Sequence, residues 1–259
     1  MMLRHQGRFE MRRGCVCLLT RLIGLGLLLL SGCADSRESN AMHRMLQEID
    51  NDFARTFEYT GIRTMSATVR GAIERTPRHR YVKDSDQSRA YVNRPLSIGH
   101  GQTISQPYIV ALMTELAMIG PQDSVLEIGT GSGYQAAILG LLAKSVKTIE
   151  LIPELSAVAA GRIAEAGLSN VECRVGDGNL GWPEAAPFDA IVVTAGGVLP
   201  PALVEQLAPN GRIVIPLNVV GGDQMLTVIA KDANGDIERT DVLPVRFVPL
   251  VRTPASLDN

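Results

Sequence analysis

The feature that most restricts the fold is a glycine-rich turn between an apolar run and a helical pattern, Val125-Leu-Glu-Ile-Gly-Thr-Gly-Ser-Gly-Tyr134. Residues 124–128 favour a strand, and residues 134–143 have the apolar spacing of a helix. Glycines between them permit positive φ and allow a ligand to approach the backbone closely. The motif therefore predicts a strand, a tight turn and a helix that form a ligand site at the carboxyl end of the strand.

Strand-like and helix-like segments alternate after this turn. Further strands are expected at residues 146–149, 171–175, 188–193 and 212–215, with a helix at 153–166. This alternation predicts an α/β, Rossmann-like fold, an open and mostly parallel sheet with helices on both faces. Two later apolar runs, 225–229 and 242–251, predict an antiparallel edge around a turn at 233–236.

The chain divides into four parts by composition. We expect a signal-like or lipoprotein-like segment at 1–33, a polar linker at 34–41, an N-terminal helical region at 42–95, and the domain with the glycine-rich turn at 96–259. Apolar residues recur at helical spacing between 42 and 74, and Pro77 ends that pattern. Another helix is expected to begin near Pro107, because proline is tolerated in the first helical turn.

The first 33 residues resemble an export signal. A basic stretch precedes the apolar residues 22–30, and Leu30-Ser-Gly-Cys33 resembles the lipobox of bacterial lipoproteins. The apolar stretch is too short to span a bilayer. One interpretation is a cell-envelope lipoprotein anchored through lipid at Cys33, which would be its only link to a membrane. The other is a cytoplasmic protein whose translation starts downstream, for instance at Met42 or Met45.

Composition excludes several classes of function. The formal net charge is −2, which gives no electrostatic attraction for nucleic acid, and only 4% of residues are aromatic, too few for a base-stacking platform. Cys173 is the single cysteine beyond residue 33, so we expect neither an internal disulfide in the domain nor a metal site. At 259 residues and 46% hydrophobic, the chain can bury a substantial core.

The residues in and before the turn separate two classes of cofactor. Dinucleotide-binding turns follow Gly-x-Gly-x-x-Gly. Here the run is Gly129-Thr130-Gly131-Ser132-Gly133, and Tyr134 stands where the third glycine would be. The carboxylate of Glu127 disfavours a pyrophosphate and suits a cofactor that carries a cationic sulfonium and an ammonium group.

Two more acids follow the neighbouring strands. Glu150 ends the second strand, where a carboxylate can accept hydrogen bonds from ribose hydroxyls. Asp177, followed by Gly178, comes after the third strand and can meet the amine of an adenine. The pattern predicts S-adenosyl-L-methionine as the cofactor. The expected cofactor site comprises Glu127, Gly129, Thr130, Gly131, Ser132, Gly133, Tyr134, Glu150, Asp177 and Gly178.

Several separated motifs resemble the protein-L-isoaspartate O-methyltransferase family over roughly residues 60–255. They are Leu96-Ser-Ile-Gly-His-Gly-Gln-Thr-Ile-Ser-Gln-Pro-Tyr108, residues 125–134, Gly176-Asp-Gly178, residues 188–195 and Arg246-Phe-Val-Pro-Leu-Val251. The resemblance implies a class I methyltransferase that moves a methyl group from S-adenosyl-L-methionine to the α-carboxylate of L-isoaspartyl residues. Its partners would be damaged proteins and peptides, which are repaired through a succinimide.

The resemblance also implies which residues act on the substrate. Ser105 matches the family's active-site serine and would orient the carboxylate, which needs no general base because it is ionised at neutral pH. Substrate contacts are expected from Thr103, Ile104, Gln106, Val248 and Leu250. Two departures from the family pattern, Asn179-Leu180 and Gly196-Gly197, would change the cofactor pocket wall and loosen the loop facing the substrate.

Two other functions fit parts of the pattern. One is a methyltransferase of the same fold that acts on a small molecule or RNA, and the other is an envelope lipoprotein whose domain only binds a ligand. The net charge weakens the RNA alternative, the loop 103–107 weakens the small-molecule one, and the intact set of acids with Ser105 weakens the non-catalytic one. S-adenosyl-L-methionine is made in the cytosol and is charged, which favours the cytoplasmic interpretation.

Overall fold

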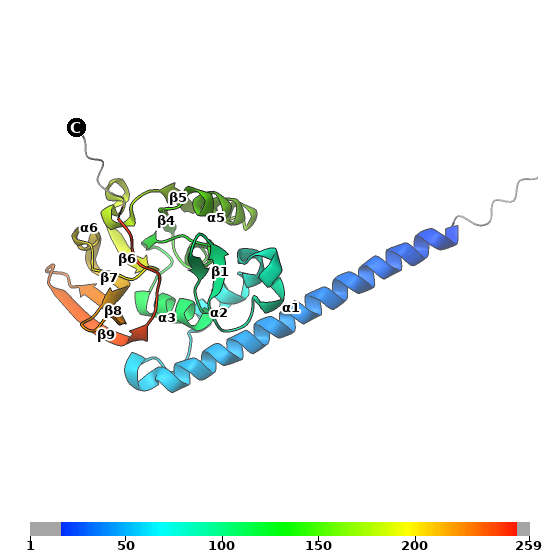
Figure 1. Ribbon diagram of the computed structural model, residues 1–259, viewed down its shortest axis with the longest axis horizontal. Helices are drawn as coiled ribbons and strands as arrows, with labels where there is room; N and C mark the ends of the chain where they lie inside the picture. The colour runs from blue at the N-terminus through cyan, green and yellow to red at the C-terminus, as the bar shows by residue number, and fades with distance from the viewer. Residues whose placement is uncertain (1–16, 253–259) are drawn as a thin grey trace, which may run out of the picture. The chain divides into compact units, whose positions relative to one another are not determined.

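The computed structural model describes the backbone of residues 17–252 and the side chains of residues 37–252 (Figure 1). It begins with α1 (Cys17–Thr60), and the chain separates into two compact units after Ala41. Residues 34–41, expected to be a linker, belong to α1; this segment has no glycine or proline to interrupt a helix. The basic residues before position 17 and the side chain of Cys33 lie outside the described residues. In the described part of the chain, no helix is long and apolar enough to cross a membrane.

The N-terminal region of the second unit is helical, as its apolar spacing predicted. Met45, Ile49 and Phe53 of α1 are fully buried, and their spacing puts them on one face of the helix. The helix α2 (Ala67–Glu74) follows, and the side chain of Ser66 caps it by accepting a hydrogen bond from an amide of its first turn. Two 3-10 helices, η1 (Arg78–Tyr81) and η2 (Asp84–Arg89), lead to the motif around Ser105.

That motif forms a β-hairpin that the sequence patterns did not indicate. Strands β1 (Leu96–Gly99) and β2 (Gln102–Ile104) pair antiparallel, and both residues of the turn between them, His100 and Gly101, have positive φ. The strands are too short to show an alternating pattern. After the hairpin, α3 (Pro107–Ala117) begins at the proline, as expected.

The main sheet has seven strands in the order β5-β4-β3-β6-β7-β8-β9. The pairs from β5 to β7 are parallel, and β7, β8 and β9 are antiparallel neighbours. This arrangement confirms the predicted open, mostly parallel sheet with an antiparallel edge. The strands are β3 (Ser124–Ile128), β4 (Ser145–Glu150), β5 (Val171–Val175), β6 (Phe188–Val193), β7 (Leu207–Asn218), β8 (Gln224–Lys231) and β9 (Ile237–Val245).

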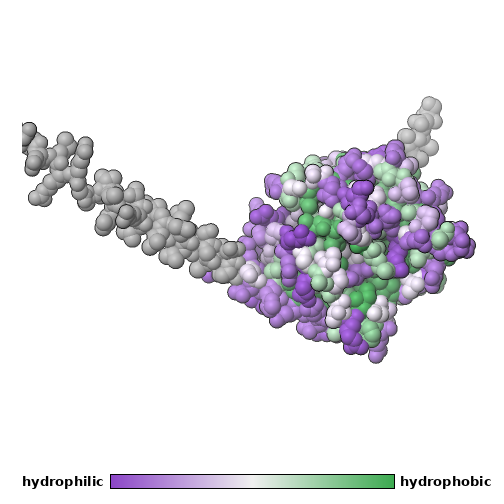
Figure 2. All heavy atoms as spheres, turned by 180° about the vertical axis from the view of Figure 1, so that it is seen from behind, coloured by the Kyte–Doolittle hydropathy of each residue, from purple (hydrophilic) through white to green (hydrophobic). Residues whose placement is uncertain are grey.

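Alternate residues of the central strands pack into two layers. Val125 lies in a cluster with residues of α1, α3 and α4 (Tyr134–Gly140), whereas Leu126 lies in a second cluster with Trp182 and with Leu203 of α6 (Pro201–Glu205). Helix α5 (Pro153–Glu165) lies beside β4 and β5 (Figure 1). Along the chain, η3 (Gly178–Leu180) and η4 (Pro183–Ala185) follow β5 and precede β6. The face seen in Figure 2 mixes hydrophilic and hydrophobic residues, with the hydrophobic ones in small separate areas.

The C-terminal segment differs from the expected strand at 242–251. Strand β9 begins earlier, at Ile237 directly after the turn, and ends at Val245. Its first residues are exposed, so they carry no apolar pattern from which the strand could be predicted. Beyond β9 the chain runs back toward the end of β6, where the amide of Gly196 donates to the carbonyl of Val248 and the amide of Leu250 donates to the carbonyl of Gly196, both at 2.8 Å (Figure 1). Pro249, which has no amide proton, stands between them.

Candidate active site

Four strands bring their carboxyl ends to one edge of the sheet. The register pairs the last residues of β3 with those of β4 and β6, and the last residue of β4 with that of β5. Gly129, Glu150, Asp177 and Thr194 follow or end these strands, so residues far apart in the sequence lie at the same edge. Ligands bind at this edge in open α/β sheets.

The turn after β3 needs glycine for two separate reasons. Gly129, Gly131 and Gly133 have φ of 94°, 51° and 85°, in the region that side chains disfavour. A Cβ on Gly129 would also lie 2.4 Å from Oγ1 of Thr194, and one on Gly133 would lie 3.2 Å from Cβ of Ala159. The glycines therefore allow a tight turn, half-buried at Gly129 and Gly131, to form at the sheet edge.

Glu150 braces this turn from the neighbouring strand. Its Oε2 accepts a hydrogen bond from the amide of Gly131 at 2.8 Å, and its Oε1 accepts one from the amide of Ile152 at 3.0 Å. Only 7% of Glu150 is exposed. Each carboxylate oxygen has a further acceptor position, so the side chain can still receive two hydroxyl groups of a ligand.

Glu127 lies beneath the turn, completely buried. The hydroxyl of Thr148 donates to its Oε2, and Oγ1 of Thr130 lies 2.6 Å from that of Thr148, so the three side chains form a buried chain. The other oxygen, Oε1, has no hydrogen-bond partner. Burial raises the pKa of Glu127 to about 8, and the nearby charge of Glu150 adds to the effect. A cationic ligand above the turn would favour the ionised form.

A cavity of about 90 Å³ opens over the turn. Of the residues expected in the cofactor site, Gly129, Gly131, Glu150 and Gly178 line it. The remaining residues of that set are not part of its lining: Glu127, Thr130, Ser132, Gly133, Tyr134 and Asp177.

Two of these residues have other surroundings that the structure describes. The side chain of Tyr134 is 1% exposed and packs edge-on against the ring of Tyr81, so it belongs to the core and not to the cavity. Oδ1 of Asp177 accepts hydrogen bonds from the amide and from Nδ2 of Asn179, both at 2.8 Å. Nδ2 of Asn179 also donates to the carbonyl of Val251 at 3.1 Å, which ties η3 to the C-terminal segment.

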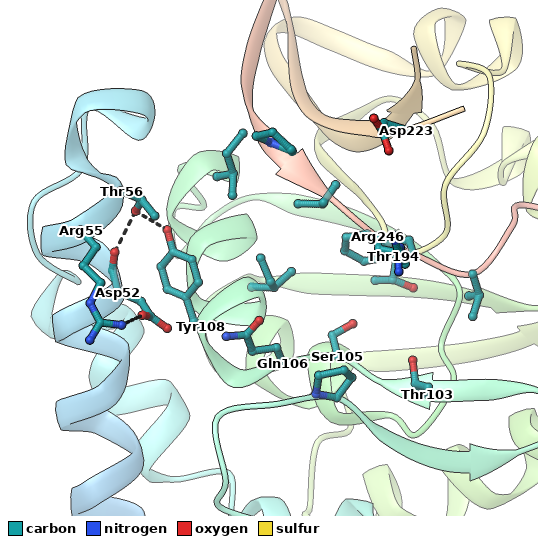
Figure 3. Close-up of a pocket in the computed structure, with 17 residues that line it drawn as sticks. Asp52, Arg55, Thr56, Thr103, Ser105, Gln106, Tyr108, Thr194, Asp223 and Arg246 are labelled. Atoms are coloured by element: carbon teal, nitrogen blue, oxygen red, sulfur yellow. Dashed lines mark hydrogen bonds and ion pairs between the residues drawn. The ribbon is translucent and has the colours of Figure 1, made fainter. Parts of the chain in front are cut away.

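A larger cavity of about 660 Å³ adjoins the first (Figure 3). Ser105 lines it, together with Thr103, Gln106 and Val248, three of the residues predicted to contact substrate. The hydroxyls of Thr103 and Ser105 point toward the side on which Thr194 and Arg246 lie (Figure 3).

The other two residues expected to contact substrate lie elsewhere. Ile104 is 3% exposed and belongs to the core, because successive residues of a strand point to opposite sides. Leu250 lines the smaller cavity. Thr103, Thr194 and Val248 line both cavities and form their common wall.

The far wall of the larger cavity comes from α1, which no motif had indicated (Figure 3). Asp52 receives hydrogen bonds from Arg55 at 3.1 Å and from Nδ2 of Asn93 at 2.8 Å. Oδ1 of Asn93 accepts the amide of Tyr108 at 3.0 Å, and the hydroxyl of Tyr108 lies 2.5 Å from that of Thr56. This network supports the start of α3, two residues after Ser105.

The sequence analysis did not name two further candidate functional residues, Thr194 and Arg78. A sequence signal was available for the first and not for the second. Thr194 donates from Oγ1 to the carbonyl of Gly129 at 2.6 Å, and its place directly after a predicted strand was a usable signal. Arg78 is fully buried and donates from Nη2 to the carbonyl of Ser105 at 2.8 Å. Nothing in the local pattern distinguishes it from a surface arginine. In the portion of the chain that the structure describes, no group of three or more His, Cys, Asp or Glu side chains could hold a metal ion.

These features define the class of protein. A mostly parallel sheet, a glycine turn after its central strand and an acid at the end of the next strand are the marks of a class I methyltransferase. The residues present fit S-adenosyl-L-methionine: Glu127 has a buried oxygen without a hydrogen-bond partner, and Glu150 lines the cavity and keeps acceptor positions for hydroxyl groups. The family model for protein-L-isoaspartate(D-aspartate) O-methyltransferase matches residues 51–255. The chain belongs to this family.

Curated relatives support the same assignment. Protein-L-isoaspartate O-methyltransferase 2 of Syntrophobacter fumaroxidans is 49% identical over 223 residues, which cover 85% of this chain and 89% of the relative. Protein-L-isoaspartate O-methyltransferase 1 of Cupriavidus necator is 47% identical over 235 residues, covering 90% of this chain and 91% of the relative.

Two solved structures share the fold. One, a protein-L-isoaspartate O-methyltransferase, superposes with a TM-score of 0.67 at 27% identity. The match covers 77% of this chain and 65% of that solved chain, just under two thirds. A Plasmodium falciparum structure assigned to the same enzymes, in complex with S-adenosyl-L-homocysteine, gives a TM-score of 0.65 at 25% identity over 78% of this chain and 98% of its own.

Proposed function

We propose that this protein transfers the methyl group of S-adenosyl-L-methionine to the α-carboxylate of L-isoaspartyl residues in proteins and peptides, the first step of their repair. One observation carries the proposal: the cavity over the glycine turn and the cavity beside Ser105 share a wall made of Thr103, Thr194 and Val248. A methyl donor in the first cavity and a carboxylate in the second would meet at that wall. The relatives named above support the choice of substrate.

We assign cofactor binding to the sheet edge. When bound, S-adenosyl-L-methionine supplies an electrophilic methyl group on a positively charged sulfur. The glycine turn would accommodate it closely, Glu150 would accept the ribose hydroxyls, and Asp177 would accept the adenine amine. The charge of Glu127 would offset the positive charge of the cofactor from below the turn.

The residues around the larger cavity then have a positioning task. The substrate carboxylate has a reference pKa near 4 and is ionised at neutral pH, so no general base is required. Ser105 would donate a hydrogen bond to this carboxylate and hold one oxygen toward the methyl group that the cofactor would supply. Orientation of this kind can supply several kcal/mol of the barrier reduction.

Repair follows without further catalysis. The backbone nitrogen of the next residue attacks the methyl ester, methanol leaves, and a succinimide forms. Water then opens the succinimide, in part to a normal aspartyl residue. The enzyme's contribution is therefore confined to making the ester at the correct carboxylate.

A substrate panel tests this function. The wild-type protein is assayed with an isoaspartyl peptide, with the same peptide carrying normal aspartate, and with small carboxylic acids, and calorimetry measures binding of S-adenosyl-L-homocysteine and NAD. We expect methylation of the isoaspartyl peptide almost alone and binding of the sulfur nucleotide only. Equal reaction of both peptides, or reaction of a small acid alone, would reject the repair function.

We also propose that the protein is cytoplasmic, because S-adenosyl-L-methionine is made in the cytosol and is charged. The alternative is a lipid anchor at Cys33 on the cell envelope. Mass spectrometry of the N-terminus of the protein purified from its own cells separates the two. A start at or after Met42 agrees with the cytoplasmic assignment, and a diacylated Cys33 overturns it.

A further inference from the structure

Arg78 is a charged residue in an unusual place. It begins η1, yet its side chain is 0% exposed. Its Nε donates to the carbonyl of Ala90 at 2.9 Å, and its Nη2 donates to the carbonyl of Ser105 at 2.8 Å and, at 3.4 Å, to that of Arg94. One guanidinium thus joins the main chain of the segment after η2 to the main chain at Ser105.

The guanidinium remains a cation in this position. Burial lowers the pKa of Arg78 from 12.5 to about 10, still well above neutral pH. Among the described residues its partners are carbonyl oxygens and the ring of Tyr134, whose centroid lies 5.0 Å from Cζ, and no carboxylate forms an ion pair with it. Burying a charge without an opposite charge costs free energy that an apolar side chain would not. A specific role for the planar set of N–H donors on the guanidinium would account for a buried arginine at this position.

Two of the guanidinium's contacts, with Ser105 and with Tyr134, connect it to elements next to the two cavities. Ser105 lies between β2 and α3 and lines the larger cavity. Tyr134 is the first residue of α4 and directly follows Gly133 of the glycine turn. Arg78 therefore connects the main chain at Ser105 with helix α4, which follows the glycine turn, although it lines neither cavity.

We propose that Arg78 is a positioning residue for methyl transfer: by holding the carbonyl of Ser105, it sets the direction of the Ser105 hydroxyl. The carbonyl carbon and Cβ of Ser105 are bonded to the same Cα, so any tilt of this main chain displaces the hydroxyl. The inference rests on the role proposed above for Ser105. A buried arginine is well suited to the task, because its donors are fixed in one plane and its fork can satisfy several carbonyls at once.

The variants are chosen to keep the fold. Arg78→Lys retains the charge but loses the planar fork, and Arg78→Gln retains a donor without the charge; either is less disruptive than a cavity left by alanine. Thr76→Val is the matched control, because Thr76 is 2% exposed and donates to the carbonyl of Ala72 at 2.8 Å but has no hydrogen bond to Ser105. Each Arg78 variant is also combined with Ser105→Ala, and thermal unfolding is measured for all proteins.

The decisive readout is a double-mutant cycle on methylation of an isoaspartyl peptide. We expect either Arg78 variant to lower kcat about tenfold to a hundredfold, as small misplacements of reacting groups do. In the Ser105→Ala background the same change should cost less than about twofold, because the hydroxyl to be positioned is gone. Thr76→Val should leave kcat within about twofold.

Two further measurements are independent of turnover. Affinity for S-adenosyl-L-homocysteine should change by less than about threefold in the Arg78 variants, because the cofactor cavity is not lined by this residue. Amide hydrogen exchange at residues 103–106 should be faster in them than in wild type or Thr76→Val. An equal loss of kcat in both backgrounds, or unchanged exchange at 103–106, overturns the role of Arg78. An inactive wild type would instead reject the proposed function, and with it the role of Ser105.

Discussion

The Oε2 atom of Glu150 accepts a hydrogen bond from the amide of Gly131 at 2.8 Å. The acid at the end of β4 therefore holds the turn that follows β3, and it does so with 7% of its surface exposed. The proposed contact of Glu150 with ribose hydroxyls and the shape of the glycine turn are thus coupled. Loss of this one side chain affects two parts of the cofactor site.

Replacing Glu150 with alanine should weaken binding of S-adenosyl-L-homocysteine about tenfold to a hundredfold, because hydrogen bonds to a charged group contribute about 1.5–3 kcal/mol each. Calorimetry measures the change. Glu154→Ala is the matched control, since Glu154 is an exposed acid in the first turn of α5 that lines neither cavity. Equal dissociation constants for the two variants would show that Glu150 has no special part in binding.

Replacing Ser105 with alanine should lower kcat on an isoaspartyl peptide about tenfold to a thousandfold, by analogy with the loss of other single donors at active sites. The loss is partial because the hydroxyl orients a carboxylate that is already ionised. Affinity for S-adenosyl-L-homocysteine should stay nearly the same. Ser97→Ala serves as the control, since Ser97 is exposed on β1 of the same hairpin and lines neither cavity. A kcat for Ser105→Ala equal to that of the control would contradict the assigned role.

Replacing Gly178 with alanine should damage both stability and cofactor binding. A Cβ there would lie 2.3 Å from Cγ2 of Ile128, a β-branched side chain that is 1% exposed and has little freedom to move. Overpacking of this kind costs about 1–3 kcal/mol of unfolding free energy. Denaturant unfolding and calorimetry with S-adenosyl-L-homocysteine measure the two effects.

Gly161→Ala is the control for that experiment. Gly161 lies within α5, and a Cβ at this position would meet no atom within 4 Å. Alanine there should raise the unfolding free energy by about 0.5–1 kcal/mol, because glycine is a poor helix former. Equal effects of the two substitutions would mean that crowding against Ile128 is relieved by a backbone shift.

The buried carboxyl of Glu127 should make stability depend on pH. Its pKa is about 8 in the folded protein and 4.5 in the reference state, so between these values the folded state binds an extra proton. The corresponding stability is fully present below pH 4.5 and is lost as pH rises through about 8. From pH 5 to pH 7 this group should lower the unfolding free energy by about 2 kcal/mol. Glu127→Gln, which can still accept a hydrogen bond from Thr148, should remove this part of the pH dependence of the unfolding free energy. Parallel curves of unfolding free energy against pH for the two proteins would disprove the prediction.

Much of the fold could be predicted because its signals are local. The strand, turn and helix at 124–143 follow from apolar spacing and from glycines that all have positive φ in the structure. The acids at the strand ends were found because parallel strands in register bring their carboxyl ends to one edge. The β1–β2 hairpin and the start of β9 were missed, since short or fully exposed strands leave no alternation in the sequence.

The sequence alone determined the class of fold and the glycine turn, because backbone dihedrals and side-chain alternation depend on residues only a few positions apart. The role of Ser105 was implied by the family resemblance and stays a prediction. Only the tertiary structure decided that Tyr134 is a core residue, that Thr194 and Val248 separate two cavities, and that Arg78 holds the main chain of Ser105, 27 residues away. It also decided the raised pKa of Glu127. Loss of water around a group, and the polar partners that replace it, depend on segments packed together from distant parts of the chain, and no local pattern contains that information.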